Sequence, residues 1–359
     1  MSSLPLELNQ VKPFGNPISF LTDKDVSAAA TNLISANSKL PPVVCHGRVQ
    51  NPEAYVPKAW WKSVFGDNLY LQTDGDVVED PAITLEEIRL LESYDVIRSI
   101  FQSKPAPFSA SSSPLLFFPD RARILDLCCG QGRHLLQLAQ LYPYLELHGH
   151  DQSQYLIELA QSRAAAANVH KQVRFTIGDC CSVPHPDNSF DLVIVMGNSF
   201  GYFATDRANK GLLEEICRVL KPGGYAVLDI PDGGYLRENF SARGWEWISD
   251  TMIACREREL SKDKKRLISR EVIISTTQGV IRDQFYAECL YSLEELKQLI
   301  NEAGLVPLSQ GSRESQEGQA VATNDTNLNL TGKDMSKRGE DLGMMEQRHL
   351  VLVMKPLAP

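Results

Sequence analysis

The sequence predicts an α/β protein with a doubly wound, mainly parallel sheet, and three observations lead to this fold class. An apolar strand ends in a glycine-containing loop, and a helical pattern begins directly after it, within the run Arg-Ile-Leu-Asp-Leu-Cys-Cys-Gly-Gln-Gly-Arg-His at residues 123–134. Strands and helices then alternate up to residue 230, as in parallel βαβ units with right-handed crossovers. Residues 190–196 are almost continuously apolar, which is typical of a buried central strand.

The expected elements follow in chain order. Strands are predicted at residues 124–128, 145–151, 173–177, 190–196 and 225–230, and further strands at 305–308 and 349–354 complete a seven-stranded sheet. Helices are predicted at about 132–141, from Ser153 to about Asn168, through Leu213 to Leu220, and from the capping box Ser292–Glu295 to Gly304. The turn residues Lys221-Pro-Gly-Gly224 are expected to end a helix before the fifth strand.

Residues 232–291 do not continue this alternation of strands and helices. Runs near 251–259, 266–276 and 280–290 contain β-branched and aromatic residues without helical periodicity, and Gln278-Gly279 provides a turn. We therefore predict an antiparallel β meander, inserted as a cap after the fifth strand. It belongs to a main domain of residues 115–359, in which the polar stretch 309–342 is expected to be a mostly disordered loop. Within and after that stretch, Asp341–Met345 is a candidate for a segment that closes over the site.

Residues 1–114 are predicted to form an N-terminal accessory segment and not an independent domain. Its first 80 residues are irregular in composition, with one aromatic cluster formed by Trp60, Trp61, Phe65 and Tyr70. One helix is expected from the capping box Thr84–Glu87, with an apolar stripe at Leu90, Tyr94, Ile97 and Phe101. A linker rich in Pro and Ser follows at residues 103–114. The aromatic cluster and the meander are the candidates for a cover that keeps solvent from the site.

Composition narrows the function classes. The 359 residues carry a net charge of −9, which argues against a nucleic-acid partner because phosphate binding needs clustered Lys and Arg. No stretch approaches the roughly 18 consecutive apolar residues of a membrane span. No secretory signal is expected. Eight cysteines without C-x-x-C spacing predict a reduced, cytoplasmic protein with no metal site.

Polar side chains follow three successive strands. Asp151 ends the second strand, Asp179 follows the third, and Asn198 follows the fourth. In an open α/β sheet, ligands bind outside these strand ends, and an acid about 20 residues after a glycine loop suits ribose hydroxyls. An acid at Asp179 suits an adenine amine. A single acid at a strand end is more often a helix cap, but three polar residues behind a glycine loop favour a binding site.

Together these motifs resemble the class I S-adenosylmethionine-dependent methyltransferases. The matching elements are Leu-Asp-Leu-Cys-Cys-Gly-Gln-Gly, the acid at 151, Gly178-Asp179, Phe190-Asp-Leu-Val-Ile-Val-Met and Leu220-Lys-Pro-Gly-Gly. The resemblance covers residues 120–231, the helix at 292–304 and the last strand. It implies a Rossmann-like sheet whose last strand, 349–354, is antiparallel. Cys128 departs from the family, whose loop most commonly has glycine at that position.

The resemblance also implies the cofactor S-adenosyl-L-methionine and its ligands. The expected cofactor-binding residues are Asp126, Cys128, Gly130, Gly132, Asp151, Gln152, Asp179, Cys180 and Asn198. On the acceptor side, the expected catalytic residues are Tyr202, Asn198, Arg282 and Tyr286. Tyr202 fits a packed loop aromatic equally well, and His185 is a weaker candidate for a base.

The loop Asn198-Ser-Phe-Gly-Tyr-Phe203 and the insertion after the fifth strand resemble small-molecule methyltransferases, and the whole chain more weakly resembles fungal secondary-metabolite methyltransferases that act on peptides or amines. These resemblances imply methyl transfer to a nitrogen atom of a small metabolite or short peptide, as in secondary-metabolite biosynthesis, with oxygen as the less favoured atom. A catalytically inactive cofactor-binding or regulatory protein of the same fold is the alternative. A nicotinamide-dependent oxidoreductase fits less well, since its glycine loop needs a third glycine where Leu135 stands.

Overall fold

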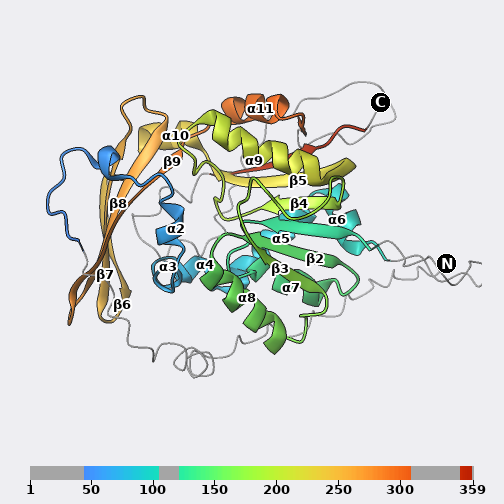
Figure 1. Ribbon diagram of the computed structural model, residues 1–359, viewed down its shortest axis with the longest axis horizontal. Helices are drawn as coiled ribbons and strands as arrows, with labels where there is room; N and C mark the ends of the chain where they lie inside the picture. Colours follow the sequence, from blue (N-terminus) through green and yellow to red (C-terminus); the bar gives the residue numbers. More distant parts are fainter. Residues whose placement is uncertain (1–43, 105–120, 309–347, 358–359) are drawn as a thin grey trace, which may run out of the picture. The chain divides into compact units, whose positions relative to one another are not determined.

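The computed structural model describes residues 44–104, 121–308 and 348–357 (Figure 1). Several predictions therefore lie outside the described residues. These are the irregular stretch before residue 44, most of the linker at 103–114, the disordered loop at 309–342 and the closing segment Asp341–Met345. Within the described ranges, no helix is both long and apolar enough to cross a membrane.

A seven-stranded sheet forms the centre of the fold, and the predicted fold class is confirmed. Its strands are β1 (Arg123–Leu127), β2 (Glu146–Asp151), β3 (Val173–Ile177), β4 (Phe190–Val195), β5 (Leu220–Pro231), β10 (Val306–Pro307) and β11 (Arg348–Met354). They are ordered β10-β11-β5-β4-β1-β2-β3. The last strand, β11, runs antiparallel to β5, as predicted. The strand order changes direction between β4 and β1, so ligands are expected beyond the carboxyl ends of these two strands.

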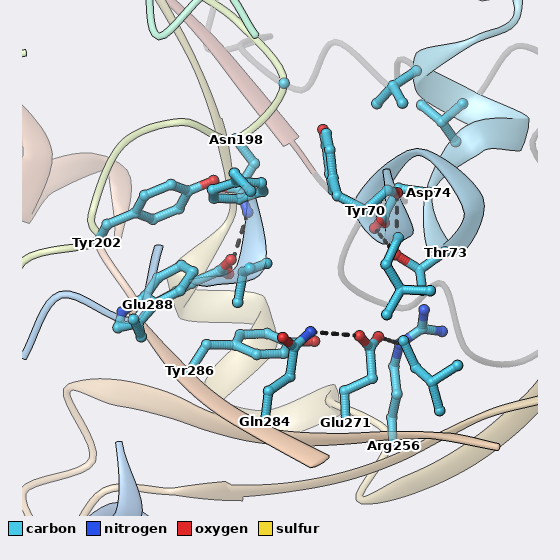
Figure 2. A pocket seen from close by; sticks show the side chains of 18 of the residues that line it. Tyr70, Thr73, Asp74, Asn198, Tyr202, Arg256, Glu271, Gln284, Tyr286 and Glu288 are labelled. Atoms are coloured by element: carbon cyan, nitrogen blue, oxygen red, sulfur yellow. Dashed lines mark hydrogen bonds and ion pairs between the residues drawn. The ribbon is translucent and has the colours of Figure 1, made fainter. Parts of the chain in front are cut away.

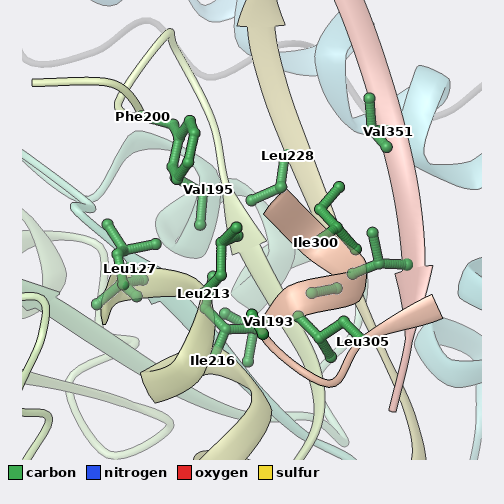
Figure 3. Close-up of a cluster of buried hydrophobic side chains, with 14 of the residues drawn as sticks. Leu127, Val193, Val195, Phe200, Leu213, Ile216, Leu228, Ile300, Leu305 and Val351 are labelled. Carbon is green, nitrogen blue, oxygen red and sulfur yellow. The ribbon is translucent and has the colours of Figure 1, made fainter. Parts of the chain in front are cut away.

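Helices cover both faces of this sheet, because each face presents a continuous apolar surface. One face packs against α9 (Asp206–Val219) and α11 (Leu293–Glu302), and Figure 3 shows Leu213, Ile216 and Ile300 of these helices against Leu127, Val193 and Leu228. The other face packs against α5 (Pro81–Glu92), α6 (Asp95–Gln102) and α7 (Arg133–Leu141). A fully buried Leu or Ile side chain contributes about 1.5–3 kcal/mol. These two clusters therefore fix the strand ends that carry the site.

Helix capping follows the sequence in two places and departs from it in a third. Ser153 caps α8 (Gln154–Ala166), and Ser292 with Glu295 forms the predicted capping box of α11. The prediction of a helix that begins at Thr84 is wrong. Asp80 caps α5 by accepting a hydrogen bond from Ala82 N, and a proline occupies the first helical position, so the capping residue lies four residues earlier than expected.

The single N-terminal helix of the prediction is also wrong. The expected stripe is divided between α5 and α6, which are separated at Ser93 and Tyr94. The segment before them folds into η1 (Pro52–Tyr55), α2 (Trp61–Val64), α3 (Leu69–Thr73) and α4 (Gly75–Val78). Helices this short gain little from propensity alone, so the sequence pattern cannot reveal them.

The insertion after β5 contains an antiparallel meander, as expected, with one strand more than the three predicted runs. Its strands are β6 (Arg243–Ser249), β7 (Met252–Leu260), β8 (Arg266–Ser275) and β9 (Gly279–Cys289), in that order. The unpredicted helix α10 (Gly233–Asn239) leads into it. Likewise, β5 begins at Leu220, five residues before the predicted start. In Figure 1, α2 and α3 lie between this four-stranded sheet and the main sheet.

Candidate active site

Three residues of the glycine loop after β1 have a left-handed backbone conformation. Cys128, Gly130 and Gly132 have φ angles of 65°, 52° and 75°. A Cβ atom on Gly132 would lie 2.8 Å from the ring of Phe175, so only glycine fits there. The loop then passes directly into α7, whose first N–H groups face the same edge of the sheet.

Asp151, at the end of β2, is tied to this loop. Its Oδ2 accepts a hydrogen bond from Gly130 N at 2.9 Å, and its Oδ1 accepts one from Ser153 N at 2.8 Å. Burial raises the pKa of Asp151, although these backbone donors oppose the shift. Each carboxylate oxygen has a second lone pair, so the side chain can still accept from two ribose hydroxyls.

Asp126 supplies a direct test of whether a cationic ligand fits this edge. The residue is 1% exposed, and its Oδ2 has no hydrogen-bond partner among the described residues. Nδ1 of His134, which is cationic only when protonated, lies 3.6 Å from this oxygen. A buried carboxylate oxygen without a hydrogen bond is costly unless a ligand donates to it. The ammonium group of a bound methionine moiety is a donor of the required kind.

Asp179 and Cys180 lie beyond β3 at the same edge. The carboxylate of Asp179 accepts from Cys181 N at 2.9 Å. The thiol of Cys180 contacts that of Cys128, and this contact together with burial raises the pKa of Cys180. The side chains of Asp179, Cys180 and Cys181 lie close enough to hold a metal ion, but raised thiol pKa values oppose the thiolate form that metals bind. The predicted cofactor residues are thus neighbours, and their role as cofactor ligands stays a prediction.

A pocket opens beside this edge, between the main sheet, the N-terminal helices and the meander (Figure 2). Its walls come from α2–α4, from the loop after β4 and from the inner face of the meander. The aromatic rings on these walls belong to Trp60, Phe65, Tyr70, Tyr202 and Tyr286. Among the described residues that line the pocket, Asn198 is the one predicted cofactor residue.

All four predicted catalytic residues line this pocket. The ring of Tyr202 lies 4.7 Å from that of Trp60, and burial raises the pKa of its hydroxyl well above the usual range. Burial likewise raises the pKa of Tyr286. Arg282 donates to Asp67 and to the backbone of Ser63, so it joins the meander to the N-terminal segment. The roles assigned to these residues stay predictions.

His185, the weaker candidate, lies at the opposite edge of the sheet. Its ring packs 5.0 Å from that of Phe190, the first residue of β4. Burial lowers the pKa of His185 to about 4. This histidine is therefore remote from the carboxyl ends where the other candidates lie.

Sequence reasoning missed Glu288, on β9. It is 9% exposed, lines the pocket, and its Oε2 accepts a hydrogen bond from Asn198 Nδ2 at 3.2 Å. Burial raises the pKa of Glu288 to about 7, while the hydrogen bond from Asn198 opposes the shift. The only available signal was alternation along the strand, since residues 282, 284, 286 and 288 all face the pocket.

The charged residues of the pocket were also missed. The acids are Asp74, Glu87, Glu246, Glu271 and Glu288, and the arginines are Arg133, Arg256, Arg258, Arg282 and Arg348. Arg282 and Arg348 pair with two acids that do not line the pocket, Asp67 and Asp229. Among the described lining residues, acids and arginines are thus equal in number, and Glu288 has a neutral side chain, that of Asn198, as its hydrogen-bond partner.

One buried cluster joins the pocket to the glycine loop. Arg133, at the start of α7, contacts Glu87 of α5 and donates to Thr84 Oγ1 at 3.1 Å. The imidazole of His134 lies 3.0 Å from the same Glu87 carboxylate. Although burial opposes it, contact with Arg133 and His134 holds the pKa of Glu87 below its usual range. The N-terminal segment is therefore locked to the helix that follows the loop.

Comparison with known proteins supports a methyltransferase domain. A family model described as a methyltransferase domain matches residues 124–224. Demethylmenaquinone methyltransferase of Lactobacillus johnsonii is 38% identical over 101 residues, which are 28% of this chain and 40% of that protein. The ubiquinone/menaquinone biosynthesis C-methyltransferase UbiE of Geobacter sulfurreducens is 30% identical over 166 residues, 42% of this chain and 62% of that protein. The chain thus spans less than two thirds of the length of these curated relatives.

Solved structures give more distant likenesses. The CcbJ methyltransferase from Streptomyces caelestis is 18% identical with a TM-score of 0.49, over 66% of this chain and 84% of that chain. The sugar N-methyltransferase KedS8 from Streptoalloteichus sp. is 15% identical with a TM-score of 0.48, over 89% of this chain and 99% of that chain. The family-model match covers β1 to the start of β5, the strands whose order and loop geometry are described above. Residues 124–224 are therefore a methyltransferase domain, and the matches support the class I S-adenosylmethionine-dependent methyltransferase superfamily for this part of the chain.

Proposed function

We propose that this protein transfers the methyl group of S-adenosylmethionine to the nitrogen of a small, polar amine. The observation that carries the proposal is the pocket beside the carboxyl edge of the sheet, in which the buried carboxylate of Glu288 hydrogen-bonds the neutral Asn198 at the junction. Asn198 follows β4 and lines the pocket, so an acceptor in the pocket lies next to any ligand across the strand ends. Proximity and alignment of this kind account for about 7–11 kcal/mol of barrier reduction in favourable cases.

On this proposal, the cofactor lies at the carboxyl edge of the main sheet beside the glycine loop, and we call this edge the cofactor edge. Asp151 accepts from the ribose, Asp126 accepts from the ammonium group of the methionine moiety, and Asp179 lies by the adenine. When bound, S-adenosylmethionine supplies an electrophilic methyl group on a sulfonium. The protein therefore needs no covalent nucleophile, and its side chains have to bind, orient and deprotonate the acceptor.

The lining of the pocket favours an amine as acceptor. The buried carboxylate of Glu288, whose hydrogen-bond partner is a neutral side chain, favours a cation, and amines are protonated near neutral pH. The rings of Trp60, Tyr202 and Tyr286 add faces that attract cations. Polar groups such as the buried Glu271 and the half-buried Gln284, which hydrogen-bond each other at 2.9 Å, suit hydroxyl groups on the same small molecule.

The acceptor in a curated relative's name does not identify the acceptor that would bind in this pocket. Demethylmenaquinone is the acceptor in one of those names, but all except four of the lining residues lie outside the matched residues 124–224. A quinone acceptor with an apolar tail would place that tail against charged side chains, which is costly. The polar lining therefore favours an amine over such an acceptor.

The test is methyl transfer from S-adenosylmethionine carrying a radiolabelled methyl group. The panel comprises ethanolamine, glucosamine, glycine and a tripeptide as amines, with catechol and a naphthoquinol as oxygen and carbon acceptors. We expect labelled N-methyl product from at least one amine, identified by mass spectrometry. Label on oxygen or carbon alone would overturn the proposal. Cofactor binding by calorimetry without transfer to any compound would favour an inactive binding protein.

A further inference from the structure

Glu288 is a pocket acid that hydrogen-bonds Asn198 at the junction with the cofactor edge. It is the last of the four β9 residues that face the pocket, and Figure 2 shows its carboxylate directed toward Asn198. Among the described residues, that asparagine is its one hydrogen-bond partner. Glu271, in contrast, is held by Arg256 at 2.7 Å and by Gln284 at 2.9 Å. Of these two buried acids, Glu288 is the one available to a ligand.

Asn198 is held in a fixed orientation by its backbone. It has a φ of 58° and follows Gly197, whose φ is 66°. Gly197 N donates to Asp229 Oδ2 at 3.0 Å, and Asp229 is paired with the buried Arg348. A left-handed asparagine is uncommon and strained, so it persists where its surroundings require it.

The amide of Asn198 leaves one acceptor without a partner. Its Nδ2 donates to Glu288, and its Oδ1 is buried with no hydrogen-bond partner among the described residues. Since a carboxylate can only accept, the amide nitrogen must face Glu288 and the amide oxygen must face elsewhere. A buried carbonyl oxygen of this kind is costly unless a ligand donates to it.

We infer that Glu288 is the general base for the acceptor amine, and that Asn198 Oδ1 and the Glu288 carboxylate together bind its ammonium group. This inference depends on the proposed function. An ammonium group has several N–H donors, enough for both oxygens. It gives one proton to the Glu288 carboxylate, which frees the nitrogen lone pair. The N–C bond then forms as the bond from methyl to sulfur breaks, and its electron pair stays on sulfur. The proton on Glu288 leaves to solvent.

The groups facing Glu288 explain how it can serve as a base near neutrality. Asn198 and Tyr202 face it from the loop after β4, Arg258 from β7, Asp74 from the turn between α3 and α4, and Tyr286 from its own strand. Burial is the largest influence and raises the pKa to about 7. A base with a pKa near the working pH is the most effective.

The experiment compares the wild type with Glu288→Gln, using the best amine acceptor of the panel. We expect kcat to fall by about 10²–10⁴-fold, with a smaller change in KM. The acid limb of the wild-type pH–rate profile, near pH 7, should disappear. Residual activity should rise only toward the pKa of the amine itself. Binding of S-adenosylhomocysteine, measured by calorimetry, should be unchanged because the cofactor edge is intact.

The matched control is Glu257→Gln on β7. Glu257 points away from the pocket, and its side chain is 47% exposed, so kcat and the pH profile should match the wild type. Retention of both kcat and the acid limb in Glu288→Gln would overturn the inference. If that variant fails to bind S-adenosylhomocysteine, the inference is tested with the Asn198→Ala variant. Loss of its hydrogen bond should raise KM and move the acid limb to higher pH, whereas an unmoved limb would overturn the inference. A wild type that methylates no amine would instead overturn the proposed function.

Discussion

The two halves of the site are built in different ways. The cofactor edge is a backbone structure, in which a loop of left-handed residues and the carboxylate of Asp151 are joined by main-chain N–H donors. The pocket proposed for the acceptor is formed by side chains, from residues between Trp60 and Arg348 that meet only in the folded protein. The proposed cofactor site is thus specified by one short motif. The proposed acceptor site depends on packing between distant elements.

Their buried carboxylates illustrate the same difference. Asp151 accepts from two backbone N–H groups, which cannot be changed by substitution. Glu288 accepts from one side-chain amide, which a single substitution removes. Acceptor preference can therefore change by substitution in the pocket while the cofactor edge stays as it is.

The largest effect is expected where the two halves are joined, in Glu87→Ala. Glu87 is 4% exposed and contacts both Arg133 and His134. Removal of the carboxylate leaves a buried guanidinium without its partner, and such changes cost about 3–5 kcal/mol. We expect a loss of this size in the free energy of unfolding, measured by urea denaturation.

Glu86→Ala is the matched control, one residue away on the same helix. Glu86 pairs with Arg89 on the surface, where both side chains are more than half exposed, so the change should stay within about 1 kcal/mol. Equal effects of the two substitutions would mean that the cluster around Glu87 does not hold the halves together.

Sequence reasoning was most accurate where the structure is local. The strand-to-helix loop, the acid at Asp151 and the capping box at Ser292 each depend on neighbours within a few residues or on one adjacent strand, and each lies where it was expected. The fold class followed from the alternation of such units.

It was least accurate where neighbours are distant in sequence. Glu288 meets Asn198 across 90 residues, and Arg282 meets Asp67 across 215. Alternation on a strand identifies two faces, but not which face is buried under another element. The same limit explains why the start of α5 was misplaced, since Thr84 fits a capping position by pattern and lies inside the helix, where it hydrogen-bonds Arg133.

The second largest effect concerns Glu288 and pH. Its folded-state pKa is about 7, above the value of 4.5 for a free side chain. Between these values, unfolding releases a proton, so the stability of the wild type should fall as pH rises from 4.5 to 7 and level off above 7. Glu288→Gln has no carboxyl group at this position, so its stability does not fall in this way as pH rises. Its stability relative to the wild type should therefore increase by about 3 kcal/mol over that range.

The measurement is urea denaturation of both proteins at several pH values across this window. A constant stability difference would show that Glu288 titrates alike in the folded and unfolded protein. The pocket would then lack the desolvation that distinguishes it from a surface carboxylate.

The third effect tests the cofactor edge. Asp151→Ala removes the proposed ribose ligand and the acceptor for Gly130 N, so binding of S-adenosylhomocysteine should weaken by about 1–3 kcal/mol, as calorimetry can measure. The control is Asp187→Ala, whose side chain is 68% exposed and pairs with Arg218; here affinity should not change. Unaltered binding in Asp151→Ala would place the cofactor elsewhere.

The smallest expected effect tests whether backbone conformation determines the shape of the glycine loop at the cofactor edge. Cys128 has a φ of 65°, a conformation that costs a side chain other than glycine about 1–2 kcal/mol. Glycine relieves this strain but loses about 0.5–1 kcal/mol through its freer unfolded chain. Cys128→Gly should therefore raise stability by up to about 1 kcal/mol in thermal denaturation. Both variants lose the thiol contact with Cys180, but Cys128→Ala also keeps the strain, so it should gain nothing. If the glycine and alanine variants are destabilised equally, side-chain packing shapes this loop as well, and the contrast between the two halves of the site becomes one of degree.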